Sequence, residues 1–222
     1  MSQPPEEPRS WPDLAGRLVA DSGGRGHVLP VRVYFEDTDF SGLVYHATYL
    51  RWCERGRSDF LRLMGNDHQA LIARFYDALG RRDAAAMAAC YAPDATFTDP
   101  VFGRLDAAGA AAMWRMLCAR GKDLRVEASG IQADAERGRA HWRAAYSYGP
   151  TARPVVNDID ATFSFRRGLI FEHIDRFDLR RWATQALGLS GRVLGLTPLL
   201  GPMVRKQAAA SLAAWRRRES AE

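Results

Sequence analysis

The sequence predicts an α+β protein in which helices close over a curved antiparallel sheet. Apolar residues recur with a helical period in segments between residues 67 and 121. From Leu124 to Asp178 they instead alternate with polar residues, as in half-buried strands, and turn-forming stretches interrupt the alternation. Helices followed by an antiparallel meander are typical of α+β domains.

Residues 1–27 mix Pro, Gly, Ser and charged residues with little periodicity, so we expect a mobile leader. The first residues are acidic and Pro-rich and lack an apolar core, which excludes a secretory signal. No apolar run reaches membrane-spanning length. The cysteines Cys53, Cys90 and Cys118 lie too far apart to suggest a disulfide framework or a metal motif. We therefore expect a cytoplasmic protein.

The next segment, residues 28–66, opens with an apolar run from Leu29 to Phe35 that predicts a strand. The polar sequence EDTDFSG predicts a turn, and an apolar stripe predicts a helix from about His46 to Met64. Gly65 is expected to end this helix, and Asn66 or Asp67 to cap the next one. We place a domain boundary near residue 67 for this reason.

The main domain, residues 67–185, begins with a helix whose buried face is marked by four apolar residues. They are Leu71, Ile72, Phe75 and Leu79. Asp106 and Gly121 bracket a later helix. The sequences ADAERG, YGPTARP and RRG then predict the turns of the meander.

Residues 186–222 predict a C-terminal extension that ends in a basic amphipathic helix. Packing against the domain or against a second subunit is one interpretation. Weak docking on a membrane surface is the other, because Arg205, Lys206 and Arg216–Arg218 can face anionic lipid beside Leu212 and Trp215.

The sequence RFYDALGRRDAAAMAACYAPDATFTDPVFG and the closing GLIFEHIDRFD carry a family resemblance. Residues 68–185 resemble the nuclear-transport-factor-2-like superfamily, in particular its SnoaL-like and ketosteroid-isomerase-like members. The resemblance implies a cone-shaped pocket for a small molecule between curved sheet and helices, and a homodimer. It does not specify a reaction, because the superfamily contains isomerases, cyclases, hydrolases and non-catalytic binders.

Asp99 lies where the resemblance places the general base of ketosteroid isomerases. An alternative role is to cap the Asp-Pro turn. The two donors that stabilise an enolate in those enzymes are missing, because Phe75 and Ala161 occupy their positions and Asp160 points to the opposite face of its strand. Steroid isomerase activity is therefore not expected.

The sequence EHIDRFD offers a second group of candidates, because Phe171, His173 and Asp175 share one face of a predicted strand. His173 can pass a proton with Asp175 or Asp99, or it can be a structural histidine whose ring nitrogens are both hydrogen-bonded. Further candidates for the pocket wall are Trp114, Trp142, Tyr146 and Asn157. No metal or nucleotide motif is present, so any reaction should need no cofactor. The formal charge of +5 is spread along the chain, and we expect no nucleic acid partner.

The sequence VRVYFEDTDFSGLVYHATYLRWCERGRSDFLRLMG resembles the start of hotdog-fold acyl-CoA thioesterases of the Tol-Pal-associated and 4-hydroxybenzoyl-CoA type. The resemblance implies that Asp39 is the catalytic acid and His46 its support, but it covers only the first strand, turn and helix. The segment is either a structural extension or a part that docks on the second domain and contributes Asp39 to a composite site.

Three hypotheses follow. The leading one is a SnoaL-like pocket protein that binds a small, mostly apolar molecule, with acid-base chemistry by Asp99, His173 and Asp175. The rival is hydrolysis of an acyl thioester at Asp39. The third is a non-catalytic binding or dimerisation module.

Overall fold

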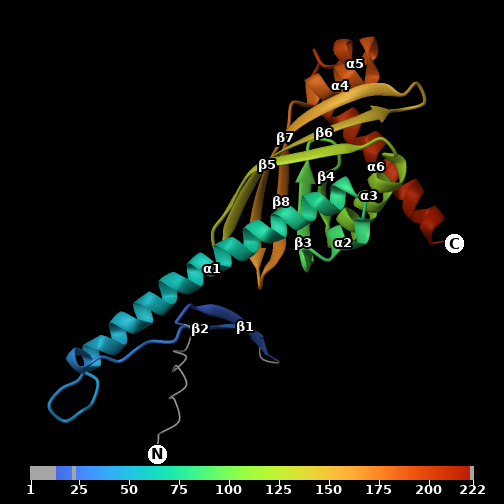
Figure 1. The fold of residues 1–222 in the computed structure, drawn as a ribbon. Helices are drawn as coiled ribbons and strands as arrows, with labels where there is room; N and C mark the ends of the chain where they lie inside the picture. Colours follow the sequence, from blue (N-terminus) through green and yellow to red (C-terminus); the bar gives the residue numbers. More distant parts are fainter. Residues whose placement is uncertain (1–13, 22–23, 221–222) are drawn as a thin grey trace, which may run out of the picture. The chain divides into compact units, whose positions relative to one another are not determined.

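The structure, a computed structural model, describes residues 14–21 and 24–220 (Figure 1). The chain forms two compact units, Met1–Leu63 and Met64–Glu222. The division lies a few residues before position 67, where the sequence indicated a boundary. None of the helices in the described residues is both long and apolar enough to cross a membrane.

The smaller unit contains a hairpin of β1 (Arg17–Asp21) and β2 (Gly24–Val28), which pair antiparallel. This hairpin occupies part of the predicted leader, whose residues 1–13 lie outside the described residues. The strand predicted from Leu29 to Phe35 is wrong: the backbone there is irregular up to the 3-10 turn η1 (Phe35–Asp37). Pro30 has no N–H to donate to a ladder, and residues 29–35 pair with no other strand among the described residues.

Helix α1 (His46–Gly80) begins at the predicted residue but continues through the predicted break. Gly65 does not end it. A Cβ at Gly65 would lie 3.0 Å from the carbonyl oxygen of Ala133, so glycine here permits close approach of the helix to the end of a strand. The next turn of α1 is fixed to the same place, because His68 Nδ1 lies 2.9 Å from the carbonyl oxygen of Asp134.

The larger unit is built on one six-stranded sheet in the order β4-β3-β8-β7-β6-β5. Its strands are β3 (Tyr91–Asp99), β4 (Gly103–Asp106), β5 (Arg125–Ala133), β6 (Arg137–Tyr148), β7 (Arg153–Arg166) and β8 (Leu169–Arg176). The predicted meander is therefore present as β5 to β8. The sheet is not purely antiparallel, because β3 and β8 pair parallel. A long stretch of chain separates these two strands, so a parallel pairing needs no tight turn.

Irregular pairing within β3, β5 and β8 interrupts the ladders and curves the sheet. The C-terminal part of α1, together with α2 (Ala84–Ala88) and α3 (Ala107–Arg120), packs against the sheet. Helix α3 has the predicted caps: the Asp106 carboxylate accepts the Gly109 N–H, and Gly121 ends the helix. The helix residues expected to be buried, Leu71, Ile72, Phe75 and Leu79, are at most 2% exposed.

Three further helices follow the sheet: α4 (Leu179–Leu187), α5 (Leu189–Leu194) and α6 (Leu200–Glu219). They bury Trp182, Leu200 and Val204 in a second core cluster with Val155 of β7. The C-terminal segment is thus part of the larger unit's core.

Candidate functional site

A cavity of about 700 Å³ lies within the larger unit. Its wall is mostly apolar and aromatic, and the sheet, α3, α4 and α6 all contribute to it. Only three lining residues are acidic or basic: Asp99, Arg120 and Asp175. A volume of this size suits a small organic ligand.

Asp99 lies at the end of β3 and lines the cavity. Its Oδ1 accepts the backbone N–H of Phe102, so the turn-capping role indicated by the sequence is present as well. Burial raises the pKa of Asp99 to about 7; the N–H of Phe102 lowers it in part, and the charge of Asp175 raises it further. Near neutral pH this carboxyl group exists in both protonation states, as general acid-base chemistry requires.

Asp175 of β8 also lines the cavity, and a buried chain of hydrogen bonds leads to it. Its Oδ1 lies 2.9 Å from His173 Nε2 and accepts the Trp142 Nε1–H at 3.3 Å. On the other side of the ring, His173 Nδ1 lies 2.7 Å from the Tyr91 hydroxyl, which accepts the Trp114 Nε1–H at 3.3 Å.

The order of donors in this chain can be assigned. Indole nitrogens only donate, so the Tyr91 oxygen accepts from Trp114. The arrangement that also uses the Tyr91 proton has this hydroxyl donating to His173 Nδ1. His173 then carries its proton on Nε2 and donates to Asp175, which accepts as a carboxylate. In this arrangement every member of the chain has a hydrogen-bond partner.

His173 does not line the cavity and is fully buried. Its two ring nitrogens lie within hydrogen-bonding distance of Tyr91 and Asp175. This geometry is that of the structural alternative, a histidine whose two ring nitrogens are both hydrogen-bonded. Proton transfer by His173 stays a prediction. Tyr91, the first residue of β3, completes the chain.

Trp114, Trp142, Tyr146 and Asn157 line the cavity. Phe171, predicted beside them, does not. An irregularity opposite Ser164 and Phe165 inserts Phe171 as an extra residue in β8, so its ring leaves the face of His173 and Asp175. The Arg166 guanidinium covers this ring instead, 3.5 Å from its centroid.

Tyr146 presents a hydroxyl group suited to donation. Its oxygen accepts the Trp182 Nε1–H at 2.9 Å, and burial raises its pKa to about 12. The phenol therefore keeps its proton near neutral pH and can donate it to a ligand oxygen. Asn157 lines the cavity with an amide that can also donate.

Positions 75 and 161 lack the polar groups expected of a steroid isomerase, as the sequence indicated. Phe75 and Ala161 are buried, and the Asp160 side chain is 82% exposed and bonded to His141. Ala161 pairs with Asp175 across the sheet, so β8 provides a carboxylate beside the position where β7 lacks one. A position-by-position sequence comparison cannot detect that the carboxylate comes from β8 and not from β7, because the two strands become neighbours only in the folded sheet.

The C-terminal helices were missed as part of the site, although their apolar positions were visible. Trp182 and Ala186 of α4 line the cavity, as do Val204, Gln207 and Ser211 of α6. Arg120 at the end of α3 lines it too and donates to Ser211.

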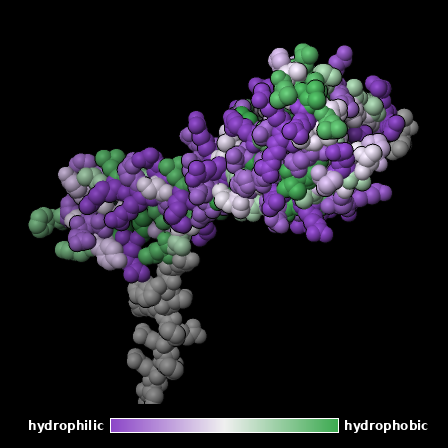
Figure 2. Space-filling view, turned by 90° about the horizontal axis from the view of Figure 1, so that it is seen from above, coloured by the Kyte–Doolittle hydropathy of each residue, from purple (hydrophilic) through white to green (hydrophobic). Residues whose placement is uncertain are grey.

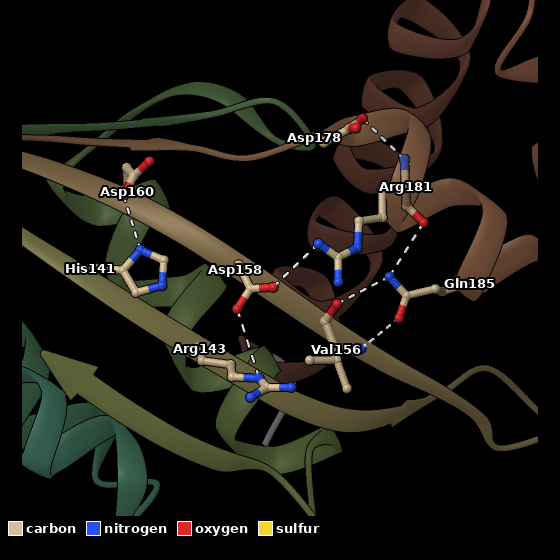
Figure 3. A network of polar contacts seen from close by, with 8 residues as sticks. All are labelled: His141, Arg143, Val156, Asp158, Asp160, Asp178, Arg181 and Gln185. Atoms are coloured by element: carbon tan, nitrogen blue, oxygen red, sulfur yellow. Dashed lines mark hydrogen bonds and ion pairs between the residues drawn. The ribbon is translucent and has the colours of Figure 1, made fainter.

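Helix α4 is held against β7 by polar contacts (Figure 3). The Gln185 side chain accepts the N–H of Val156 at 2.8 Å and donates to its carbonyl at 3.0 Å. Strand β8 pairs with β7 only as far as Asp160, and Gln185 pairs the backbone of β7 beyond that point. Asp158 adds ion pairs to Arg181 and Arg143. The cavity wall formed by α4 is thereby fixed to the sheet.

In the smaller unit, Asp39 and His46 are both exposed. Asp39 Oδ1 accepts the N–H of Ser41, the hydroxyl of Ser41 and the N–H of Leu43, and these bonds lower the pKa of Asp39. His46 begins α1 and its ring lies against Tyr45. No contact joins Asp39 to His46 among the described residues, so the predicted pair is not assembled.

Across residues 14–21 and 24–220, no three His, Cys, Asp or Glu side chains converge as metal ligands do. The cavity's own groups are acids, amides, hydroxyls and one guanidinium. These are groups for hydrogen bonding and proton transfer.

Residues 72–173 match the SnoaL-like domain family. The larger unit is a SnoaL-like domain with the α+β nuclear-transport-factor-2-like fold, as its sequence indicated. A crystal structure described as a SnoaL-like polyketide cyclase from Jannaschia sp. CCS1 shares this fold, with a TM-score of 0.50 and 13% identity over 55% of this chain and 93% of that one.

A short N-terminal segment is similar to curated acyl-CoA thioesterases. It is 51% identical over 47 residues to acyl-CoA thioesterase YbgC of Haemophilus influenzae, covering 21% of this chain. It is 54% identical over 44 residues to acyl-CoA thioester hydrolase YbgC of Escherichia coli O6:H1, covering 20% of this chain. The chain spans about a third of the length of these relatives, 35% and 33% respectively.

Proposed function

We propose that the SnoaL-like domain binds a small, mostly apolar molecule in its cavity and that Asp99 moves a proton on it. One observation carries this proposal: a carboxyl group with a pKa of about 7 faces a cavity whose other walls are mainly apolar and aromatic. An apolar wall binds an apolar ligand, and a group that is half ionised near neutral pH both removes and returns protons.

The neighbouring groups support a reaction beside a carbonyl. Ionised Asp99 takes a proton from the carbon next to the carbonyl group, and negative charge then develops on the carbonyl oxygen. The Tyr146 hydroxyl and the Asn157 amide line the same cavity and supply the donors that such an oxygen needs. Neutral Asp99 returns the proton to the same carbon or to another, so that exchange or isomerisation results.

Asp175 tunes this step without transferring the proton. The chain from Trp114 through Tyr91 and His173 holds the Asp175 carboxyl group in place, and the charge of Asp175 raises the pKa of Asp99. Asp99 and Asp175 therefore have different roles within one cavity: the first exchanges the proton and the second acts on it through its charge.

Deuterium exchange tests the proposal without knowledge of the natural ligand. The full chain in D₂O is incubated with ketones that have acidic α-hydrogens, such as 2-tetralone and 2-octanone, and exchange is followed by proton NMR. We expect exchange above the buffer rate, reduced at least about 100-fold in Asp99→Asn. Asp94→Asn is the matched control, because Asp94 lies on the same strand, is exposed and pairs with Arg166.

Exchange that survives unchanged in Asp99→Asn contradicts the proposed role of Asp99. Binding of the ketone to wild type without exchange favours the third hypothesis, a non-catalytic pocket. Absence of binding by every ketone in the panel contradicts the proposed ligand class.

Thioester hydrolysis is the rival function, because the N-terminal segment is 51% and 54% identical to the two acyl-CoA thioesterases. We propose instead that this segment is a hotdog-derived extension without its own activity. Among the described residues, the strands of the smaller unit are β1 and β2 alone. Asp39 is exposed to solvent, so water competes with its carboxylate for contacts to a thioester. A panel of acyl-CoA thioesters is the test, and hydrolysis that Asp39→Ala abolishes would overturn the proposal.

A further inference from the structure

Five large apolar side chains are exposed within fifteen residues of the C-terminal segment. Their exposed fractions are 81% for Leu189, 67% for Val193, 83% for Leu196, 59% for Leu199 and 54% for Met203. They extend over α5, the turn after it and the first turn of α6. Figure 2 shows hydrophobic side chains gathered on the larger unit at the position of α5. We name these five residues the α5–α6 patch.

The residues between them hold the patch in place. Leu194, Leu200 and Val204 pack into the second core cluster, so the same backbone presents one set of side chains to the core and another to solvent. Gly191 supports this arrangement: a Cβ there would lie 2.0 Å from the carbonyl oxygen of Ala183, so α5 contacts α4 at backbone distance. The patch is consequently a built surface of the fold, and contiguous exposed apolar surface of this kind marks a binding face.

The segment that carries the patch has only positive charges. Residues 179–218 contain no Asp or Glu and eight cationic residues. These are Arg180, Arg181, Arg192, Arg205, Lys206, Arg216, Arg217 and Arg218. Arg192 and Arg205 are exposed on the elements that carry the patch.

We propose that the α5–α6 patch docks on the surface of an anionic lipid bilayer. Aliphatic side chains enter the boundary between head groups and acyl chains, while the surrounding arginines contact lipid phosphates. The absence of carboxylates over forty residues favours this partner, because an anionic membrane repels acidic groups. Aliphatic side chains offer no ring for base stacking, which argues against nucleic acid.

The lipid-facing residues differ from those indicated by the sequence. Leu212 is buried in the main core, and Trp215 packs against it with the Arg120 guanidinium 6.0 Å from the Trp215 ring. The later turns of α6 therefore serve packing, and the surface available to lipid belongs to α5 and the start of α6.

The smaller unit offers a matched comparison within the same chain. Phe40 is fully exposed and Leu43 is 68% exposed, but the acids Glu36, Asp37 and Asp39 lie beside them in the sequence. An apolar surface with acidic neighbours does not favour anionic lipid.

Vesicle cosedimentation tests the proposal with the full-length chain. Phosphatidylcholine vesicles are compared with vesicles containing phosphatidylglycerol at low and at high salt. We expect binding to the anionic vesicles that weakens in high salt and falls at least about tenfold in Val193→Glu/Leu196→Glu. The control Phe40→Glu/Leu43→Glu should retain binding, and circular dichroism verifies that both variants are folded.

Any of three results would overturn the proposal. In the first, wild type does not bind anionic vesicles. In the second, the Val193→Glu/Leu196→Glu variant binds them as well as wild type does, and equal binding of both proteins to heparin would then assign the surface to polyanions. In the third, light scattering shows a dimer that this variant converts to monomer, which assigns the patch to a second copy of the chain.

Discussion

Replacing Asp99 with Asn should change how the stability of the protein depends on pH. Burial raises the pKa of Asp99 from 3.8 to about 7 in the folded protein, whereas the unfolded chain keeps the ordinary value. Between these two pH values the folded protein therefore binds more protons than the unfolded chain. The free energy of unfolding contributed by Asp99 is fully present below about pH 4 and is lost as the pH rises through 7.

The size of the effect follows from the shift. About three pKa units, each equivalent to 1.36 kcal/mol, give a loss of about 4 kcal/mol between pH 4 and pH 8. Asp99 keeps some exposure to the cavity, so we expect about 2–4 kcal/mol. The variant lacks this titration, and the difference in unfolding free energy between wild type and variant should change by this amount.

Urea unfolding of both proteins from pH 4 to pH 8, followed by tryptophan fluorescence, measures the difference. Asp134→Asn provides a control whose difference from wild type should stay constant over this range, because the N–H groups of Arg137 and Glu136 lower the pKa of Asp134. Its contribution is present above the unfolded pKa and is lost only as the pH falls below about 4. A difference for Asp99→Asn that stays constant over the whole range would refute the reasoning.

Other substitutions test the packing around the site. Tyr91→Phe leaves Trp114 Nε1 and His173 Nδ1 without partners and should lower the unfolding free energy by about 2–4 kcal/mol. A loss below about 0.5 kcal/mol, measured by urea unfolding, would contradict the chain of hydrogen bonds. Gly65→Ala should destabilise the protein, because the new Cβ would lie too close to the Ala133 carbonyl oxygen. Gly56→Ala, whose Cβ would have nothing within 4 Å, should stabilise the same helix by up to about 1 kcal/mol. Equal changes in the melting temperature of the two variants would contradict the role given to Gly65. Gln185→Leu should cost about 1–3 kcal/mol and increase hydrogen exchange at Val156, and unchanged exchange there would show that α4 is held otherwise.

Local patterns in the sequence were sufficient for most elements of the larger unit. The caps at Asp106 and Gly121 and the alternation along β6 and β7 are local signals, and each corresponds to an observed element. The continuity of α1 was not accessible in this way. Gly65 has the properties of a helix end in the sequence, and only its contact with Ala133 explains why the helix continues.

The site shows the same division between local and tertiary information. Asp99, Trp114, Trp142, Tyr146, Asn157 and Asp175 line the cavity, and each was a candidate from its residue type and its place in the sequence pattern. Phe171 was misplaced because one extra residue in β8 reverses the alternation, and no residue type announces it. His173 was assigned to the wall because a strand pattern gives the face of a residue but not its depth.

The most direct test of the account is a crystal structure of the full chain with 2-tetralone. We predict the ketone in the cavity of the SnoaL-like domain, with an α-carbon near the Asp99 carboxyl group and its oxygen within hydrogen-bonding distance of Tyr146 or Asn157. A cavity occupied by protein side chains, or a ketone bound with its oxygen away from these groups, would contradict it.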